Sequence, residues 1–208
     1  MKRFIKHIVI TGGPQAGKTS FLSYIKKELE AKGFTVFSFS ETATDLINTG
    51  FNPNIDGYDF QRILFSLQNK KEEIGLACTK NRLLDKKNIN TKIVVFFDRS
   101  CIDIKAYIPE EIWKQILYYH NLNETQILNR YDVIIHLETV LTLKKSILEN
   151  KTNPARYETN KSEAINIDKN LLEVYKRHKN IKIIGAYENV SEKYSKFTEI
   201  IEKELQIY

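Results

Sequence analysis

The most specific pattern in the chain lies near its start, in the stretch Ile8-Val9-Ile10-Thr11-Gly12-Gly13-Pro14-Gln15-Ala16-Gly17-Lys18-Thr19-Ser20. From Gly12 to Thr19 it follows the pattern G-x-x-x-x-G-K-[ST] of a phosphate-binding loop. An apolar run precedes this pattern and a helical pattern follows it, which is the strand–loop–helix context that such a loop requires. The stretch therefore predicts a nucleotide-binding site near the start of the chain.

Each fixed position of the pattern has a chemical reason. Gly12 and Gly17 allow backbone angles at which successive N–H groups turn toward phosphate oxygens. The helix that starts near Gly17 adds unpaired amides and the positive end of its dipole. Lys18 reaches the β- and γ-phosphates, and the Thr19 hydroxyl suits a Mg²⁺ ion. The alternative is a glycine-rich turn that binds nothing. The residues expected to bind the nucleotide are Gly12, Gly13, Pro14, Gln15, Ala16, Gly17, Lys18, Thr19 and Ser20.

Composition sets broad limits on the class of protein. The 208 residues suit a single domain spanning 1–208, and they carry a net charge of +6. Because the basic residues are mostly scattered lysines with no Arg-rich block, a solvated surface explains this charge better than a nucleic-acid site. No apolar run is long enough to span a membrane, and the two cysteines suit free thiols, so we expect a cytoplasmic protein.

The order of apolar patterns predicts an α/β fold. Strands separated by helices indicate a five-stranded parallel sheet with helices on both faces, a three-layer sandwich, and the phosphate loop makes it of the P-loop NTPase type. The strands are predicted at residues 5–11, 34–40, 93–97, 131–137 and 181–184. Helices are predicted at residues 17–32, 41–48, 58–87, from 109 through 117, after Asn123, at 140–149, at 162–178 and from Ser191 onward.

Two connecting segments receive separate predictions. Turn chemistry predicts a loop over residues 51–57, and Gly75 weakens the helical pattern that follows it. A polar segment after the predicted helix at 140–149 suits a lid over the phosphates at about 140–160.

In parallel sheets, ligands bind beyond the carboxyl ends of the strands, and acidic and basic side chains gather there in this sequence. Asp98 follows a wholly apolar run, so we expect it to hold Mg²⁺ together with Thr19. Arg99 would stabilise the charge of the transferred group. The alternative makes Asp98 a helix cap and Arg99 its surface partner.

Three further residues are candidates whose position leaves two readings open. Glu41 either accepts a proton from a substrate hydroxyl or simply stabilises a helix N-terminus. Arg156 is either a lid residue that acts on the phosphates or an exposed loop arginine. Gln61 either recognises a polar edge of the substrate or is solvated. The candidate catalytic residues are Lys18, Glu41, Asp98, Arg99 and Arg156, and the candidate substrate residues are Glu41, Gln61 and Arg99.

Taken together, these residues resemble a P-loop small-molecule kinase. The chain is similar to an AAA-domain family that includes the nicotinamide riboside kinase domain and the TRPL-translocation-defect proteins. The shared elements are Thr11-Gly12-Gly13-Pro14-x-Ala16-Gly17-Lys18-Thr19, Glu41-Thr42-Ala43-Thr44, Phe60-Gln61, Asp98-Arg99, Arg130-Tyr131-Asp132, Asn153-x-x-Arg156 and Asp168-x-x-Leu171. The resemblance implies a fold like that of the nucleoside and nucleotide kinases and ATP or GTP with Mg²⁺, and it supports roles for Glu41, Arg99 and Arg156. Ser100 departs from the glycine expected in many members and is closer to the nucleoside kinases.

Two functions remain open at this point. The first is transfer of a γ-phosphoryl group from Mg·ATP to a hydroxyl of a small molecule, for example a nucleoside such as nicotinamide riboside. The alternative is a non-catalytic regulatory protein in which ATP or GTP controls binding to a protein partner or an acidic phospholipid. Kinship of fold does not decide between them. The sequence predicts no oligomeric state.

Overall fold

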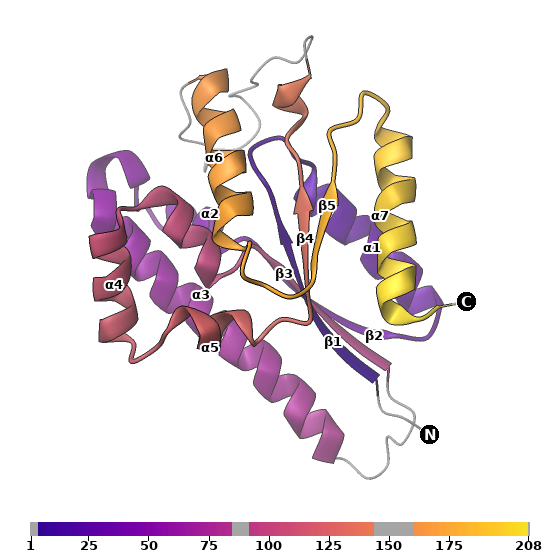
Figure 1. Ribbon diagram of the computed structural model, residues 1–208. Coiled ribbons are helices and arrows are strands. Elements are labelled where there is room, and N and C mark those ends of the chain that lie inside the picture. Colours follow the sequence, from indigo (N-terminus) through magenta and orange to yellow (C-terminus); the bar gives the residue numbers. More distant parts are fainter. Residues whose placement is uncertain (1–3, 85–91, 144–159, 208) are drawn as a thin grey trace.

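A five-stranded, fully parallel sheet forms the centre of the molecule (Figure 1). The computed structural model describes residues 4–84, 92–143 and 160–207. The strand order is β2-β3-β1-β4-β5, which confirms the predicted α/β fold of the P-loop NTPase type. The strands are β1 (Phe4–Thr11), β2 (Thr35–Phe39), β3 (Lys92–Asp98), β4 (Val133–Leu137) and β5 (Ile181–Ile184).

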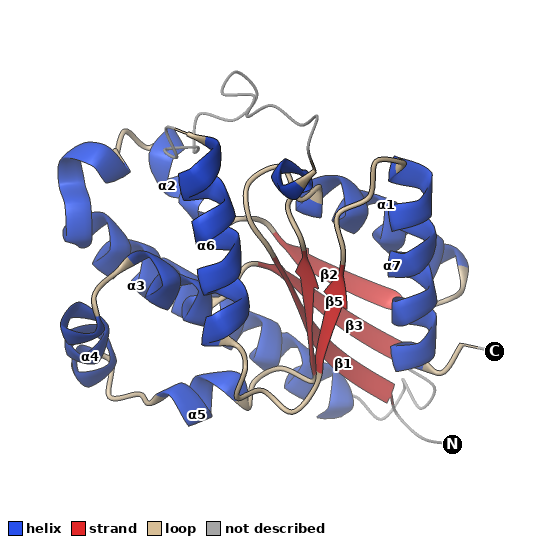
Figure 2. Ribbon diagram, turned by 45° about the horizontal axis from the view of Figure 1, so that its top comes forward, coloured by secondary structure: helices blue, strands red, loops and turns tan. Residues whose placement is uncertain are grey.

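Helices cover both faces of this sheet (Figures 1 and 2). The helices are α1 (Lys18–Ala31), α2 (Thr42–Asn48), α3 (Pro53–Leu84), α4 (Glu110–Tyr119), α5 (Glu124–Leu128), α6 (Lys161–Val174) and α7 (Val190–Leu205), with 3-10 turns η1 (Cys101–Tyr107) and η2 (Val140–Thr142). Helices α1 and α7 pack on one face, and α3 to α6 lie against the other. No helix in the described ranges is long and apolar enough to cross a membrane.

The strand sequences follow from burial on both faces. In β1, Ile8 and Ile10 pack toward α1 and α7, whereas Val9 between them packs toward the helices of the opposite face. All three side chains are completely buried. A strand covered on both sides needs an apolar residue at every position, so its sequence is a continuous apolar run rather than an alternating one.

Two predicted segments differ from the structure. Residues 51–57 are not simply a loop, because α3 already begins at Pro53, whose fixed φ suits a first helical position. Gly57, with φ 52° and ψ −123°, then interrupts the helix, as its turn chemistry suggests. The helix predicted at 140–149 is wrong for its first turn, where only the 3-10 turn η2 forms. Residues 144–149 lie outside the described part of the chain.

Gly75 does not interrupt α3; it allows the helix to lie close to the sheet. A Cβ atom at this position would lie 2.7 Å from Phe97 Cζ and 3.2 Å from Phe39 Cε2. These two rings stack on each other with centroids 5.3 Å apart, so neither can move freely. The glycine is therefore a packing requirement between α3 and the sheet.

We predict that Gly75→Ala lowers the free energy of unfolding by about 1–3 kcal/mol, because the methyl group overpacks the core. At an unconstrained helical site the same substitution would raise it by roughly 1 kcal/mol. Urea titrations of the two proteins test the sign. Phe97→Leu in the Gly75→Ala background should recover part of the loss, and a stabilised single variant would contradict this packing argument.

Candidate functional site

The phosphate loop connects β1 to α1 at the carboxyl edge of the sheet. Gly12 has φ 139°, and a Cβ atom there would lie 2.1 Å from the carbonyl oxygen of Leu137. No side chain fits this contact, so glycine is required both for its backbone angle and for its closeness to β4. Gln15 and Gly17 also have positive φ values, of 57° and 86°.

The start of α1 is left open for an anion. Gly17 is the N-cap and supplies no side-chain cap, and the first turn contains no acidic residue. The first amides of a helix have no partner within the helix, and they usually obtain one from a capping side chain. At α1 these amides therefore remain available for phosphate oxygens.

The side chain of Lys18 forms hydrogen bonds to the backbone of its own loop. Its Nζ donates hydrogen bonds to the carbonyl oxygens of Gly12 (2.8 Å) and Gly13 (3.1 Å). Burial and then the nearby charge of Arg99 lower the pKa of Lys18, while the carboxylates of Glu41 and Asp98 oppose the shift. The ammonium is thus held where phosphate oxygens would replace the carbonyl groups as its partners.

Asp98, at the end of β3, lies beside Thr19 of the loop. The Thr19 hydroxyl donates to Asp98 Oδ2 over 3.3 Å, and Asp98 Oδ1 is buried with no hydrogen-bond partner among the described residues. Burial raises the pKa of Asp98 to about 6, although the charge of Lys18 opposes the shift. A buried, unpaired carboxylate oxygen beside a threonine hydroxyl fits a Mg²⁺ ion, which prefers oxygen ligands and retains several waters.

Glu41 and Arg99 form a partly buried ion pair next to Lys18, with side chains 19% and 16% exposed. Arg99 Nε donates to Glu41 Oε1 over 2.6 Å, and the Thr44 hydroxyl donates to Glu41 Oε2 over 2.9 Å. Burial acts to raise the pKa of Glu41, but the charges of Arg99 and Lys18 and these hydrogen bonds outweigh it and lower the pKa to about 2. Glu41 is the N-cap of α2, yet its side chain makes no capping hydrogen bond.

Arg99 is held in place through its backbone as well as its side chain. It has φ 71°, a rare angle for a residue other than glycine, and its N–H donates to the Ile10 carbonyl over 3.0 Å. Gln68 Nε2 donates to the Arg99 carbonyl, and Thr42 donates to Gln68 Oε1. Strained backbone that is supported in this way is common at functional sites. Arg99 is therefore neither a surface residue nor the partner of Asp98.

The two remaining candidates are Gln61 and Arg156. Gln61 is buried, at 5% exposed, and its Oε1 has no partner among the described residues, so it is not a solvated glutamine. Arg156 and most of the predicted lid lie outside the described residues.

A second buried network, which the sequence analysis did not assign to the site, supports the strand ends. Asp103 accepts hydrogen bonds from the Thr11 hydroxyl, the Ser100 N–H (2.6 Å) and the Tyr175 hydroxyl (2.8 Å). Ser100 caps η1 and forms a capping box with Asp103, which gives the serine at this position a structural role. The spacing Ser100-x-x-Asp103 is the local signal that could have revealed this turn.

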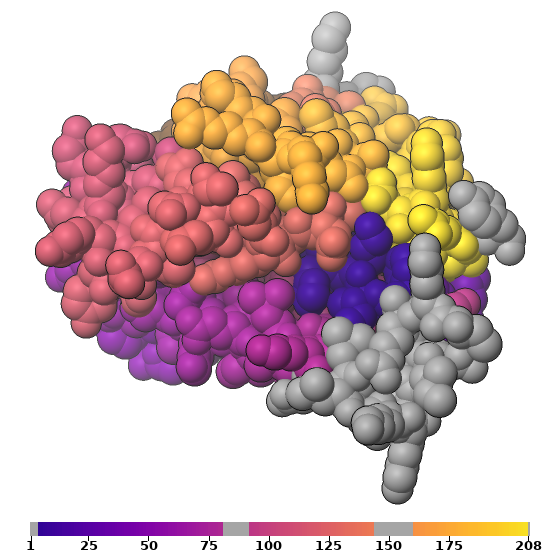
Figure 3. Space-filling model, turned by 60° about the horizontal axis from the view of Figure 1, so that its bottom comes forward, coloured from indigo at the N-terminus to yellow at the C-terminus, as the bar shows by residue number. Residues whose placement is uncertain are grey.

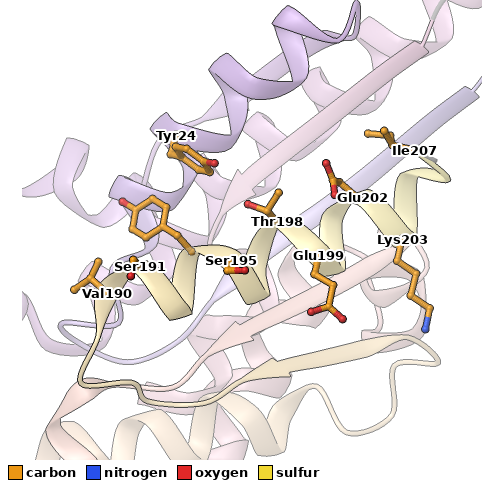
Figure 4. A pocket seen from close by; sticks show the side chains of 10 residues that line it. Tyr24, Val190, Ser191, Ser195, Thr198, Glu199, Glu202, Lys203 and Ile207 are labelled. Carbon is orange, nitrogen blue, oxygen red and sulfur yellow. The ribbon is translucent and has the colours of Figure 1, made fainter.

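Two hollows lie away from the predicted site. An open groove of about 930 Å³ runs along α7 beside α1, where Tyr24, Thr198, Glu202 and Ile207 face it (Figure 4). A smaller one of about 370 Å³ lies between α3 and α4 and is lined by Arg62, Gln115 and His120, among others. Neither is lined by a residue of the phosphate loop or by Glu41, Asp98 or Arg99.

Comparisons with known proteins identify the family and the fold. A family model described as an AAA domain matches residues 7–193, so the chain belongs to this family of P-loop proteins. A search of curated proteins with the sequence found no match.

Two solved structures of deoxyadenosine kinase from M. mycoides share the fold. The one with bound dATP has a TM-score of 0.52 and 18% identity, and the one with the products dCMP and a flexible dCDP has 0.58 and 15%. Each comparison covers 95% of this chain and 99% of the other. The fold is thus that of a P-loop NTPase like the nucleoside kinases.

We predict that Asp98→Asn stabilises the protein above pH 6. The folded-state pKa of Asp98, about 6, lies above the usual aspartate value of 3.8, so its ionisation destabilises the fold as pH rises through this range. The variant should be more stable by about 1–3 kcal/mol at pH 8, and the difference should shrink toward pH 4. Urea titrations with EDTA at several pH values measure it. A difference that does not change with pH would contradict the burial of a charged Asp98.

Proposed function

We propose that this protein is a small-molecule kinase that transfers the γ-phosphoryl group of ATP or GTP to a hydroxyl group. The observation that carries this proposal is the partly buried Glu41–Arg99 pair beside Lys18. A loop that only binds a nucleotide needs no second carboxylate beside Asp98, whereas phosphoryl transfer needs a group that accepts the proton of the acceptor. The fold shared with deoxyadenosine kinase supports the proposal.

In the proposed reaction, the acceptor oxygen forms a bond to the γ-phosphorus while the bond to the β-phosphate bridging oxygen breaks. The nucleoside diphosphate leaves, and the hydroxyl proton passes to Glu41. With a pKa of about 2, Glu41 is ionised at neutral pH and orients the hydroxyl by accepting its hydrogen bond. It is a weak base, so the proton moves only as the new bond to phosphorus makes the oxygen acidic.

The remaining residues stabilise the negative charge of the phosphates. Lys18 and the amides of the loop bind the phosphate oxygens, and Arg99 acts on the transferred group. We also assign Arg156 to this role, from its position in the sequence. Thr19 and Asp98 would hold Mg²⁺, which neutralises phosphate charge when bound.

We further propose that the acceptor is a nucleoside or a similar molecule, such as nicotinamide riboside. Gln61 is buried and keeps a side-chain oxygen without a partner among the described residues. A buried polar atom of this kind costs free energy unless a ligand pairs with it. The amide of Gln61 offers both a donor and an acceptor, which suits the polar edge of a base.

The test is the release of nucleoside diphosphate from ATP or GTP in the presence of a panel of nucleosides and sugars. With the acceptor that raises the rate most, Glu41→Gln should lower kcat by about 100-fold or more, because proton acceptance is lost. The affinity for ATP should change by less than about threefold, because Glu41 does not contact the nucleotide phosphates in the proposed reaction.

Glu73→Gln is the matched control, since Glu73 is also paired with a cation, Lys70, but lies exposed on α3. It should leave kcat unchanged. If ATP binds but no acceptor raises the rate above simple hydrolysis, and Glu41→Gln has no effect, the kinase proposal fails. The non-catalytic, nucleotide-dependent regulatory protein would then be the better explanation.

A further inference from the structure

Three side chains from distant parts of the chain form hydrogen bonds to the backbone of the phosphate loop. Asp168 on α6 accepts the Gly13 N–H over 2.6 Å, and Lys193 on α7 donates to the Ala16 carbonyl over 3.2 Å. The Thr139 hydroxyl, just before η2, donates to the Pro14 carbonyl over 2.5 Å. These partners lie 125 to 177 positions away from the loop along the chain.

Asp168 is the centre of this arrangement. Its side chain is nearly buried, its Oδ2 accepts the Thr139 N–H over 3.3 Å, and His136 Nε2 lies 3.3 Å from its Oδ1. Burial acts to raise the pKa of Asp168, but His136 and the two backbone N–H groups outweigh it and lower the pKa. The ionised carboxylate thus connects the loop, the end of β4 and α6.

The conformation of Gly13 shows how closely Asp168 approaches the loop. Gly13 is not among the residues with positive φ, so its backbone angles do not call for glycine. A Cβ atom there, however, would lie 2.8 Å from Asp168 Oδ1 and 2.9 Å from Asp168 Cβ. Gly13 stands at a variable position of the motif, and here the nearby Asp168 carboxylate requires a glycine.

We propose that Asp168 and Thr139 are positioning residues that keep the phosphate loop in its nucleotide-binding shape without touching the nucleotide. The Lys18 ammonium donates to the Gly12 and Gly13 carbonyls, and these bonds break when phosphate oxygens become its partners. The hydrogen bonds that Asp168, Thr139 and Lys193 make to the loop backbone can persist when the nucleotide binds. A loop whose shape is fixed before binding loses less conformational entropy on binding, so its affinity is higher.

This inference rests on nucleotide binding by the loop and not on phosphoryl transfer, so its test measures binding alone. Asp168→Asn keeps the size of the side chain but replaces one carboxylate oxygen with an NH₂ group. This group cannot accept a hydrogen bond from the N–H of Gly13 or of Thr139. One hydrogen bond to a charged acceptor is lost, and we expect the Kd for Mg·ATP, or for Mg·GTP if that is the nucleotide bound, to rise about tenfold. Isothermal titration calorimetry below the unfolding transition of both proteins measures it.

Asp132→Asn is the matched control. Asp132 also accepts a backbone N–H, that of His7, over 2.8 Å and lies 3.6 Å from the His7 ring. It directly precedes β4 at the opposite edge of the sheet from the loop, the side viewed in Figure 3, where β1 reaches the surface in indigo. This variant should bind the nucleotide with wild-type affinity within about twofold, whatever its effect on stability.

Thr139→Val provides an independent measurement of nucleotide affinity, and it tests the proposal if Asp168→Asn does not fold. It removes the hydroxyl bonded to the Pro14 carbonyl and leaves the carboxylate in place, and it should raise the Kd about threefold or more. The proposal is overturned if the folded variants bind as tightly as the wild type, if Asp132→Asn weakens binding equally, or if the wild type binds neither nucleotide. A failed kinase assay with normal nucleotide binding leaves it standing.

Discussion

The close approach of Gly12 to the end of β4 is the constraint on which the site depends. The loop passes so near the Leu137 carbonyl that a single added methyl group would overlap it. Because the loop lies against β4 here, side chains that follow this strand, such as Thr139, can reach its backbone. The parallel sheet provides this geometry, since β1 and β4 are direct neighbours whose carboxyl ends meet at one edge.

Two carboxylates at this edge of the sheet, Asp98 and Glu41, have pKa values shifted in opposite directions. Asp98 is buried without a full set of partners, and its raised pKa reflects the cost of keeping it ionised. The Glu41 side chain in the same cluster is 19% exposed. Burial acts to raise its pKa as well, but the charge of the Arg99 guanidinium outweighs it and lowers the pKa. Two neighbouring carboxylates thus have separate ionisation ranges, and differences of this kind commonly accompany separate roles. The unpaired one suits a cation, and the paired one is fixed in orientation.

The sequence predicted the sheet and the phosphate loop because both depend on local patterns. Continuous apolar runs identify doubly buried strands, and the glycine spacing identifies the loop. Glu41, Asp98 and Arg99 follow strand ends in the sequence, and in the structure they lie in one cluster around Lys18. Two predictions failed for different reasons. Turn-forming residues predicted a loop at 51–57, whereas Pro53, whose fixed φ suits a first helical position, starts α3. Gly75 counted against a helix that needs this glycine for packing on Phe97, a contact between residues distant in the sequence.

Asp168 shows why the support of the loop could not be predicted from local sequence. The residue lies within a regular helix, where an aspartate is most often solvated, and its partner Gly13 is 155 positions away. The family element Asp168-x-x-Leu171 marks the position without explaining it. In the structure, Leu171 is buried one turn along α6 from Asp168, so the same turn that anchors the helix also presents the carboxylate to the loop. Packing of α6 and the shape of the phosphate loop are therefore linked, and a change in either would be transmitted through a single buried carboxylate.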